Sequence, residues 1–289
     1  MEYKRICQKC NKEIRYKSYN AWYTANKNNS LCRSCSAKAR TVHCGDLNKL
    51  LEETNEAYYW IGFLLADGSF CNGRLKFSLS KKDSDQVYKF AEFINYTGTF
   101  SKSDTAISIA VKDIDTVTQI CKKFNIFPQK TYNPPKNLRK LNKDKLYCLL
   151  AGFIDGDGSI KNQNKRDDFF LRIKNHSSWK EVLELFSELI VNKNCVKINS
   201  KGYAELTISN TKKLQEFKSK IISYNIPILK RKWDIINMDF VSKYTKAEET
   251  RNKVLKLLQQ NVKQQDIAKI CNTSPANVSK IKKNYYEKN

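Results

Sequence analysis

The sequence predicts an α+β fold in which one arrangement of elements occurs twice. Three observations predict it: residues 50–240 repeat one order of apolar helix, strands and amphipathic helices, four cysteines stand in two Cys-x2-Cys pairs near the start, and the last segment has the periodicity of short helices. We therefore expect a four-cysteine module at 1–44, a core with repeats at about 50–135 and 140–240, and a three-helix domain at 246–289.

The charge of the chain predicts a polyanionic partner. The formal net charge is +24 over 289 residues, which favours nucleic acid or an anionic membrane surface. Since the chain contains no apolar run long enough to span a bilayer and no apolar signal-peptide core, we expect nucleic acid as the partner, no membrane and a cytoplasmic location. Basic residues outnumber acidic ones by 10 to 2 in 1–44 and by 14 to 6 in 230–289, so we interpret both ends as DNA-binding modules.

Four of the ten cysteines have the spacing of metal ligands. Cys7 and Cys10 form one Cys-x2-Cys pair, and Cys32 and Cys35 form the second. Four thiolates from two tight turns suit a closed tetrahedral site, which predicts a structural Zn²⁺ ion in a zinc finger. A redox pair or reduced core cysteines are the alternatives.

The elements of the two repeats correspond one to one. Each repeat begins with an apolar helix that ends in Asp-Gly-Ser, written YWIGFLLADGSF at 59–70 and LLAGFIDGDGSI at 149–160. The strands are expected at 73–80, 105–111, 169–175 and 195–209. The amphipathic helices are expected at 85–94, 114–124, 179–190 and 212–222. Each repeat closes with a similar tail, NIFPQK at 125–130 and NIPILK at 225–230.

Small residues predict that the two apolar helices pack closely against each other. Gly62 and Ala66 lie four residues apart in the first helix, as Gly152 and Gly156 do in the second. Residues four apart share one face of a helix, and small side chains there let two backbones approach.

Asp67 and Asp157 are predicted to meet at one end of this helix pair. Each helix is expected to stop at the next residue, Gly68 or Gly158, in the left-handed conformation. Carboxylates at a helix C-terminus are unfavourable unless a cation offsets them, and with helix-end carbonyls they provide the oxygen ligands that Mg²⁺ prefers. The pattern predicts a metal-dependent phosphodiester hydrolase site, and the alternative is that Asp-Gly only marks a turn after a buried helix.

LLAGFIDGDGSI closely resembles the signature of the LAGLIDADG homing endonucleases, and YWIGFLLADGSF resembles a divergent second copy. The resemblance implies a monomeric, single-chain enzyme with a pseudo-two-fold pair of αββαββα repeats. It also implies signature helices in the centre, saddle-shaped sheets in the DNA major groove, and double-stranded DNA as the partner, with site-specific hydrolysis of both strands.

The resemblance implies which residues bind the catalytic Mg²⁺. The final acid of each motif is a metal ligand, which gives Asp67 and Asp157, assisted by the backbone carbonyls of Ala66 and Gly156. Asp155 has no acidic counterpart in the first copy, so we interpret it as part of helix-end packing.

The resemblance also implies a lysine near the end of each repeat, where it stabilises phosphate charge or polarises water. The candidates are Lys130 and Lys230, with Lys232 competing for the second role. A polar residue after the first long strand of each repeat would organise water, and the candidates are Lys81 and Asn175.

The last segment has the pattern of a helix-turn-helix. The residues expected to pack inward are Ile267, Ala268, Ile270, Val278 and Ile281. Asn272 is expected in the left-handed turn and Ser274 as the N-cap of the third helix. The residues expected to contact DNA are Pro275, Ala276, Asn277, Ser279, Lys280, Lys282 and Lys283. The alternative is a small helical cap packed on the core.

Two other functions fit parts of the sequence. One is a DNA-binding transcriptional regulator that kept the fold and lost cleavage, although binding alone does not require Asp67 and Asp157. The other is an RNA maturase that assists the splicing of its own intron. The target sequence does not follow from the residues.

Overall fold

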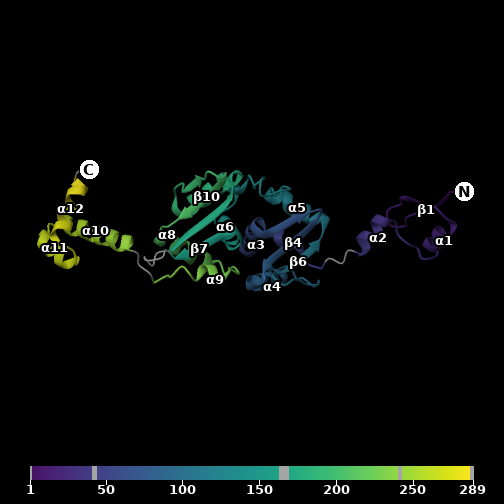
Figure 1. Cartoon of the computed structure of the whole chain (residues 1–289), viewed down its shortest axis with the longest axis horizontal. Helices are drawn as coiled ribbons and strands as arrows, with labels where there is room; N and C mark the ends of the chain where they lie inside the picture. The colour runs from purple at the N-terminus through teal and green to yellow at the C-terminus, as the bar shows by residue number, and fades with distance from the viewer. Residues whose placement is uncertain (1, 41–43, 163–168, 240–242, 287–289) are drawn as a thin grey trace.

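A computed structural model describes residues 2–40, 44–162, 169–239 and 243–286 (Figure 1). The fold is α+β with antiparallel sheets, as the sequence predicts. Among the described helices, none has both the length and the apolar character needed to cross a bilayer.

The first repeat builds one four-stranded antiparallel sheet with the order β3-β4-β6-β5. Its elements are η1 (Leu47–Leu51), α3 (Asn55–Asp67), β3 (Gly68–Cys71), β4 (Arg74–Ser80), η2 (Lys81–Asp83), α4 (Ser84–Phe93), β5 (Ser101–Lys102), β6 (Ala106–Lys112) and α5 (Ile114–Phe124). Buried and exposed residues alternate along β4, so one face of the sheet packs on the helices and the other faces solvent.

The second repeat builds a sheet with the equivalent order, β7-β8-β10-β9. Its elements are η3 (Leu138–Lys140), α6 (Lys143–Asp157), β7 (Gly158–Asn162), β8 (Phe169–His176), η4 (Ser177–Trp179), α7 (Lys180–Val191), β9 (Val196–Ile198), β10 (Tyr203–Ile208), α8 (Thr211–Ser223) and α9 (Lys230–Trp233). The same connectivity in both sheets confirms that the expected order of elements occurs twice.

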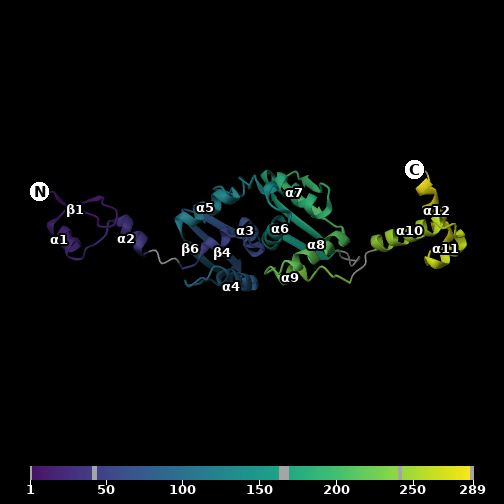
Figure 2. The ribbon, with the colours of Figure 1, turned by 180° about the vertical axis from the view of Figure 1, so that it is seen from behind.

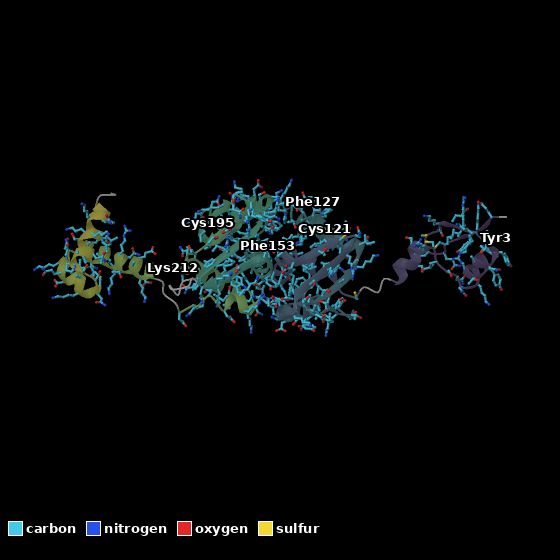
Figure 3. The ribbon with its side chains drawn as sticks, viewed as in Figure 1. Tyr3, Cys121, Phe127, Phe153, Cys195 and Lys212 are labelled. Carbon is cyan, nitrogen blue, oxygen red and sulfur yellow. The ribbon has the colours of Figure 1, made fainter. Side chains whose placement is uncertain are left out.

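Helices α3 and α6 join the two repeats into one core. Figures 1 and 2 both show them side by side between the two sheets. A single cluster of buried side chains runs through both repeats, with Trp60 and Phe77 in the first and Phe153 and Trp179 in the second. Phe153 is completely buried and lies in the middle of the core (Figure 3). Contact between the two repeats is therefore part of the hydrophobic core.

The tail of each repeat packs on the other repeat. After α5, the carbonyls of Lys130 and Thr131 accept hydrogen bonds from Trp179 Nε1 at 3.2 and 3.1 Å. After α8, Arg231 Nη2 donates to Asp83 Oδ2 of the first repeat at 2.6 Å. These contacts hold the two tail segments in place, and each tail carries a candidate lysine of its repeat.

The last part of the chain forms three helices, α10 (Lys243–Gln259), α11 (Gln264–Ile270) and α12 (Pro275–Tyr286). Their buried residues are Val254, Ile267, Ala268, Val278 and Ile281. Asn272 is left-handed with φ 47°, and Ser274 Oγ accepts a hydrogen bond from the Asn277 amide at 3.2 Å, as expected.

The prediction that Ile270 packs inward is wrong, because 50% of its surface is exposed. Ile267, Ala268 and Cys271 contribute to the inner face of α11. Ile270 lies about 200° around the helix from Ala268 and therefore points away from that face.

Candidate active site and candidate metal centre

Helices α3 and α6 touch through their backbones, and we call this contact the seam. A Cβ added to Gly62 would lie 1.8 Å from the Leu149 carbonyl oxygen, and one added to Gly152 would lie 1.9 Å from the Tyr59 carbonyl oxygen. Near the end of the seam, a Cβ on Gly156 would lie 2.2 Å from Cβ of Ala66. These distances confirm that small residues bring the two helices together.

The expected left-handed conformation of the glycines that follow the seam is wrong. Gly68 has φ −77° and Gly158 has φ −81°, so both are extended and begin strands β3 and β7. Both positions are instead crowded by the helix that precedes them. A Cβ would lie 2.6 Å from the Leu64 carbonyl oxygen at Gly68 and 2.7 Å from that of Ile154 at Gly158. Glycine is needed here for close approach and not for a positive φ.

Asp67 and Asp157 are the last residues of α3 and α6, and both are exposed. Burial on the protein side raises the pKa of Asp67 to about 6, and the charge of Asp157 adds to this effect. Burial also raises the pKa of Asp157, while Lys130 and Lys232 oppose that shift. The two carboxylates therefore share one electrostatic site, at which a bound cation would favour their charged forms.

Asp155 is buried and accepts three hydrogen bonds. Its donors are Tyr59 Oη at 2.9 Å, the Leu229 amide at 2.8 Å and Trp233 Nε1 at 2.7 Å. Burial raises the pKa of Asp155 to about 6. These contacts agree with its interpretation as helix-end packing. Sequence reasoning missed these partners, and the one available signal was an acid inside an apolar helix with no acidic counterpart in the first repeat.

The two candidate lysines bind the carbonyl ends of the helices. Lys130 Nζ donates to the carbonyl oxygens of Leu65 and Ala66, both at 2.6 Å. Lys232 Nζ lies 2.6 to 3.0 Å from four carbonyl oxygens, those of Ile154, Asp155, Gly156 and Gly158. The carbonyls of Ala66 and Gly156, expected as metal ligands, accept ammonium hydrogen bonds in this structure. Each ammonium group offsets the negative end of a helix dipole.

The structure places Lys232, and not Lys230, at the end of α6. Lys230 is exposed at the start of α9, whereas Lys232 is 8% exposed. The tails correspond at Asn125 and Asn225, both left-handed with φ 51°, but Lys232 lies inside the helical turn α9, two residues farther from Asn225 than Lys130 is from Asn125. The similarity of NIFPQK and NIPILK does not reveal this offset.

Of the two candidate water-organising residues, only Asn175 has a hydrogen bond to an acid of the site within the part of the chain that the structure describes. Its Nδ2 donates to Asp157 Oδ2 at 2.9 Å. Strand register pairs Gly158 with Ile173 and Gly68 with Phe77, so the counterpart of Asn175 in the first repeat is Leu79. Lys81 stands two residues farther on, exposed in η2. Lys81 and Asn175 therefore do not stand at equivalent positions of the two repeats.

The donor set at the end of the seam suits Mg²⁺ in part. Asp67 and Asp157 provide hard carboxylate oxygens, and Asp67 Oδ2 is 3.2 Å from the point where a Cβ on Gly156, the residue before Asp157, would stand. In the described part of the chain, no third acid or histidine joins this pair. Mg²⁺ commonly keeps several waters and takes one or two carboxylates plus substrate phosphates, which matches this site.

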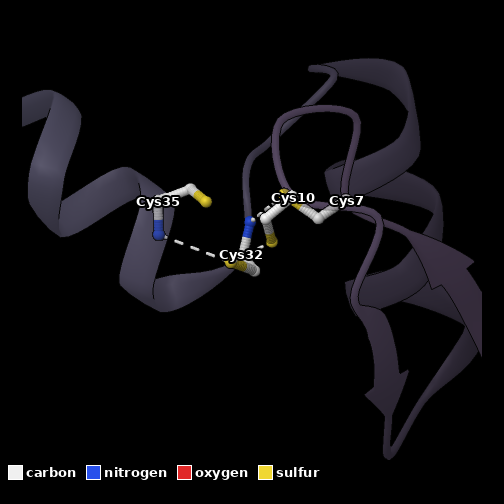
Figure 4. A group of neighbouring side chains, drawn as sticks. All are labelled: Cys7, Cys10, Cys32 and Cys35. Atoms are coloured by element: carbon white, nitrogen blue, oxygen red, sulfur yellow. Dashed lines mark hydrogen bonds between the residues drawn. The ribbon is translucent and has the colours of Figure 1, made fainter.

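The first 40 residues place the four paired cysteines together. The module consists of β1 (Tyr3–Ile6), β2 (Glu13–Tyr16), α1 (Tyr19–Lys27) and α2 (Arg33–Arg40). The Sγ atoms of Cys7, Cys10, Cys32 and Cys35 all lie within 4.8 Å of one another (Figure 4).

Backbone N–H groups support thiolates in this cluster. The Cys32 amide donates to Cys7 Sγ at 3.3 Å, and the Cys35 amide donates to Cys32 Sγ at 3.4 Å. The first contact is the main cause that lowers the pKa of Cys7 to about 6, and the second is the main cause that lowers the pKa of Cys32. Four soft thiol ligands at this separation could bind zinc.

Comparison with known proteins identifies one part of the core. Residues 144–222 match the LAGLIDADG-like domain. No curated protein matches the chain.

Several solved structures are similar to the chain. The meganuclease I-SmaMI bound to uncleaveable DNA with a TTCT central four is 16% identical over 60% of this chain and 85% of that one, with a TM-score of 0.44. The LAGLIDADG homing endonuclease I-GzeII in complex with its DNA target is 15% identical over 71% and 91%, with a TM-score of 0.46. I-SmaMI bound to uncleaved DNA in the presence of calcium ions is 14% identical over 71% and 92%, with a TM-score of 0.42. The residues that match the LAGLIDADG-like domain, 144–222, fall in the second repeat, from α6 to α8.

Proposed function

We propose that the chain is a homing endonuclease that hydrolyses both strands of a specific duplex DNA site with Mg²⁺. The observation that carries the proposal is the position of Asp67 and Asp157 at matching ends of α3 and α6, each beside a lysine that caps its helix. The net charge of +24 and the LAGLIDADG-like domain at 144–222 support it.

Asp67 and Asp157 would hold Mg²⁺, which supplies Lewis acidity toward phosphate oxygens and lowers the pKa of bound water. The two acids lie at corresponding ends of a pseudo-symmetric pair of helices. Each acid would therefore serve one strand of the duplex. Because both come from one chain, we expect the protein to act as a monomer.

The two lysines differ in what they can still bind. An ammonium group has three N–H donors, and Lys130 uses two of them on the Leu65 and Ala66 carbonyls. Its third donor can contact a phosphate oxygen. Lys232 has four carbonyl acceptors around three donors, so we assign it to holding the end of α6 and not to the substrate.

The two ends of the chain would lengthen the DNA site. We propose that Zn²⁺ binds the four paired cysteines as a structural ion, because a site with four protein ligands leaves no open position. At the C-terminal end, we propose that the start of α12 contacts DNA as a helix-turn-helix. The residues assigned to this role are Pro275, Ala276, Asn277, Ser279, Lys280 and Lys283.

Selection of cleaved molecules from a randomised duplex library in Mg²⁺ tests the proposal. We expect one enriched site, cut on both strands, with no product in EDTA or with the Asp67→Asn, Asp157→Asn double variant. Tight binding to selected DNA without cleavage would instead favour a transcriptional regulator. Stronger binding to structured RNA than to duplex DNA would favour a maturase.

A further inference from the structure

The two halves of the candidate site differ in how the acid is held. In the second repeat, Asn175 lies on β8 and donates to Asp157 Oδ2 at 2.9 Å. In the first repeat, the equivalent position on β4 is Leu79, whose side chain cannot donate a hydrogen bond. Within the described residues, the Asp67 carboxylate has no hydrogen-bond partner.

The helix ends that carry the acids also differ in how firmly they are held, and again the second repeat has more contacts. Lys232 ties down four carbonyl oxygens around the end of α6, from Ile154 to Gly158, whereas Lys130 holds two at the end of α3. The residues flanking Lys232 are anchored as well. Trp233 Nε1 donates to Asp155 at 2.7 Å, and Arg231 Nη2 donates to Asp83 at 2.6 Å. The end of α6 is therefore clamped more firmly than the end of α3.

An acid that is already oriented loses less freedom when it binds its ligand, and the resulting preorganisation favours reaction. On the proposed endonuclease function, we propose that the two halves of the site are unequal, with the Asp157 half binding metal more tightly and cutting its strand first. Asn175 acts as the positioning residue of that half, and Leu79 leaves the Asp67 half without one.

Cleavage followed on each strand separately tests the order. The duplex from the library selection carries a different label on each strand, and rates are measured with enzyme in excess so that binding does not limit them. We expect the wild type to accumulate one nicked species, always on the same strand. Asn175→Leu should slow the faster strand about tenfold, the effect of losing one hydrogen bond to a charged group, and should leave the slower strand within twofold.

Two further variants separate positioning from a loss of folding. Asn175→Gln keeps the amide and should restore most of the rate of the faster strand. Leu79→Asn supplies the missing donor and should speed the slower strand, a gain that a destabilised protein would not show. Equal rates for the two wild-type strands, or equal slowing of both strands by Asn175→Leu, would overturn the proposal.

Binding of Mn²⁺ by calorimetry, without DNA, tests the inequality independently of cleavage. The Asp67→Asn variant keeps only the carboxylate of the Asp157 half, and the Asp157→Asn variant keeps only that of the Asp67 half. We expect the Asp67→Asn variant to bind Mn²⁺ about tenfold more tightly than the Asp157→Asn variant does. Adding Asn175→Leu to the Asp67→Asn variant should remove that difference. Equal affinities would overturn the unequal-halves proposal even if the enzyme cuts DNA. Unequal affinities in a protein that cuts no DNA would refute the endonuclease function and leave the inequality standing.

Discussion

Substitution of Gly152 by alanine should push the two central helices apart. The added Cβ would lie 1.9 Å from the Tyr59 carbonyl oxygen and 2.7 Å from the Phe63 amide nitrogen. Ordinary van der Waals contact begins at 3.4 Å, so the helices must separate by about 1.5 Å at this point. Because both contacts are backbone atoms of α3, no change of rotamer relieves the clash.

The energetic cost of Gly152→Ala follows from this geometry. Overpacking a core costs about 1 to 3 kcal/mol, and a clash between two backbones belongs at the upper end. The better helix propensity of alanine returns about 1 kcal/mol. We expect a net loss of about 2 kcal/mol in the free energy of unfolding, equivalent to about 4 to 8 °C in the melting temperature of a core of this size.

Urea unfolding of the full chain, followed by tryptophan fluorescence, measures this loss. Ser219→Ala, on the exposed face of α8, is the control and should change the free energy of unfolding by less than about 0.5 kcal/mol. A Gly152→Ala variant as stable as the wild type, or more stable, would refute the seam, because helix propensity would then act without a clash. Displacement of Asp157 by the same separation should lower cleavage about 100-fold.

Three other predictions concern separate parts of the chain. Asp155→Leu leaves three buried donors without an acceptor and should lower the free energy of unfolding by about 4 kcal/mol, and an unchanged urea midpoint would contradict this. Cys10→Ser should reduce bound zinc, measured by mass spectrometry of metals, from one ion per chain to nearly none. The control is Cys71→Ser, which changes an exposed cysteine outside the cluster and should keep the zinc ion. The pKa of Asp67 is raised from 3.8 to about 6 in the folded protein, so folding disfavours its charged form. The resulting loss of stability begins above pH 3.8 and is complete above pH 6. In metal-free buffer, Asp67→Asn should therefore stabilise the protein by about 1 kcal/mol at pH 7.5, allowing for solvent screening, and not at pH 3.5. Equal effects at the two pH values would contradict that origin.

The sequence predicts the repeated elements well, because each one carries a local signal. Helix α5 begins and ends at the predicted residues, since Asp113 Oδ1 accepts from the Thr116 amide at its start and Asn125 takes the left-handed conformation at its end. The seam follows from the spacing of Gly62, Ala66, Gly152 and Gly156, because helical geometry fixes which residues share a face.

The errors occur where an assignment depends on long-range geometry. The counterpart of Asn175 is set by the register between β3 and β4. The sequence does not fix this register, so Leu79 and Lys81, two residues apart, could not be told apart as the equivalent position. Lys232 and not Lys230 reaches the end of α6 because both lie on the helical turn α9, and a four-residue helix has no periodicity to detect. Glycine stands at position 68 because a Cβ would meet Leu64, a contact that the residue spacing does not show.

The central claim is that Asp67 and Asp157 each carry out the hydrolysis of one DNA strand. Conversion of a supercoiled plasmid with the selected site into nicked and linear forms tests it most directly, with the dissociation constant of the uncut duplex measured in Ca²⁺ as a control. We predict that Asp67→Asn and Asp157→Asn each abolish the linear product while binding DNA within about threefold of the wild type, because each removes one carboxylate and no helix contact. A linear product formed at the wild-type rate by either variant would contradict the claim.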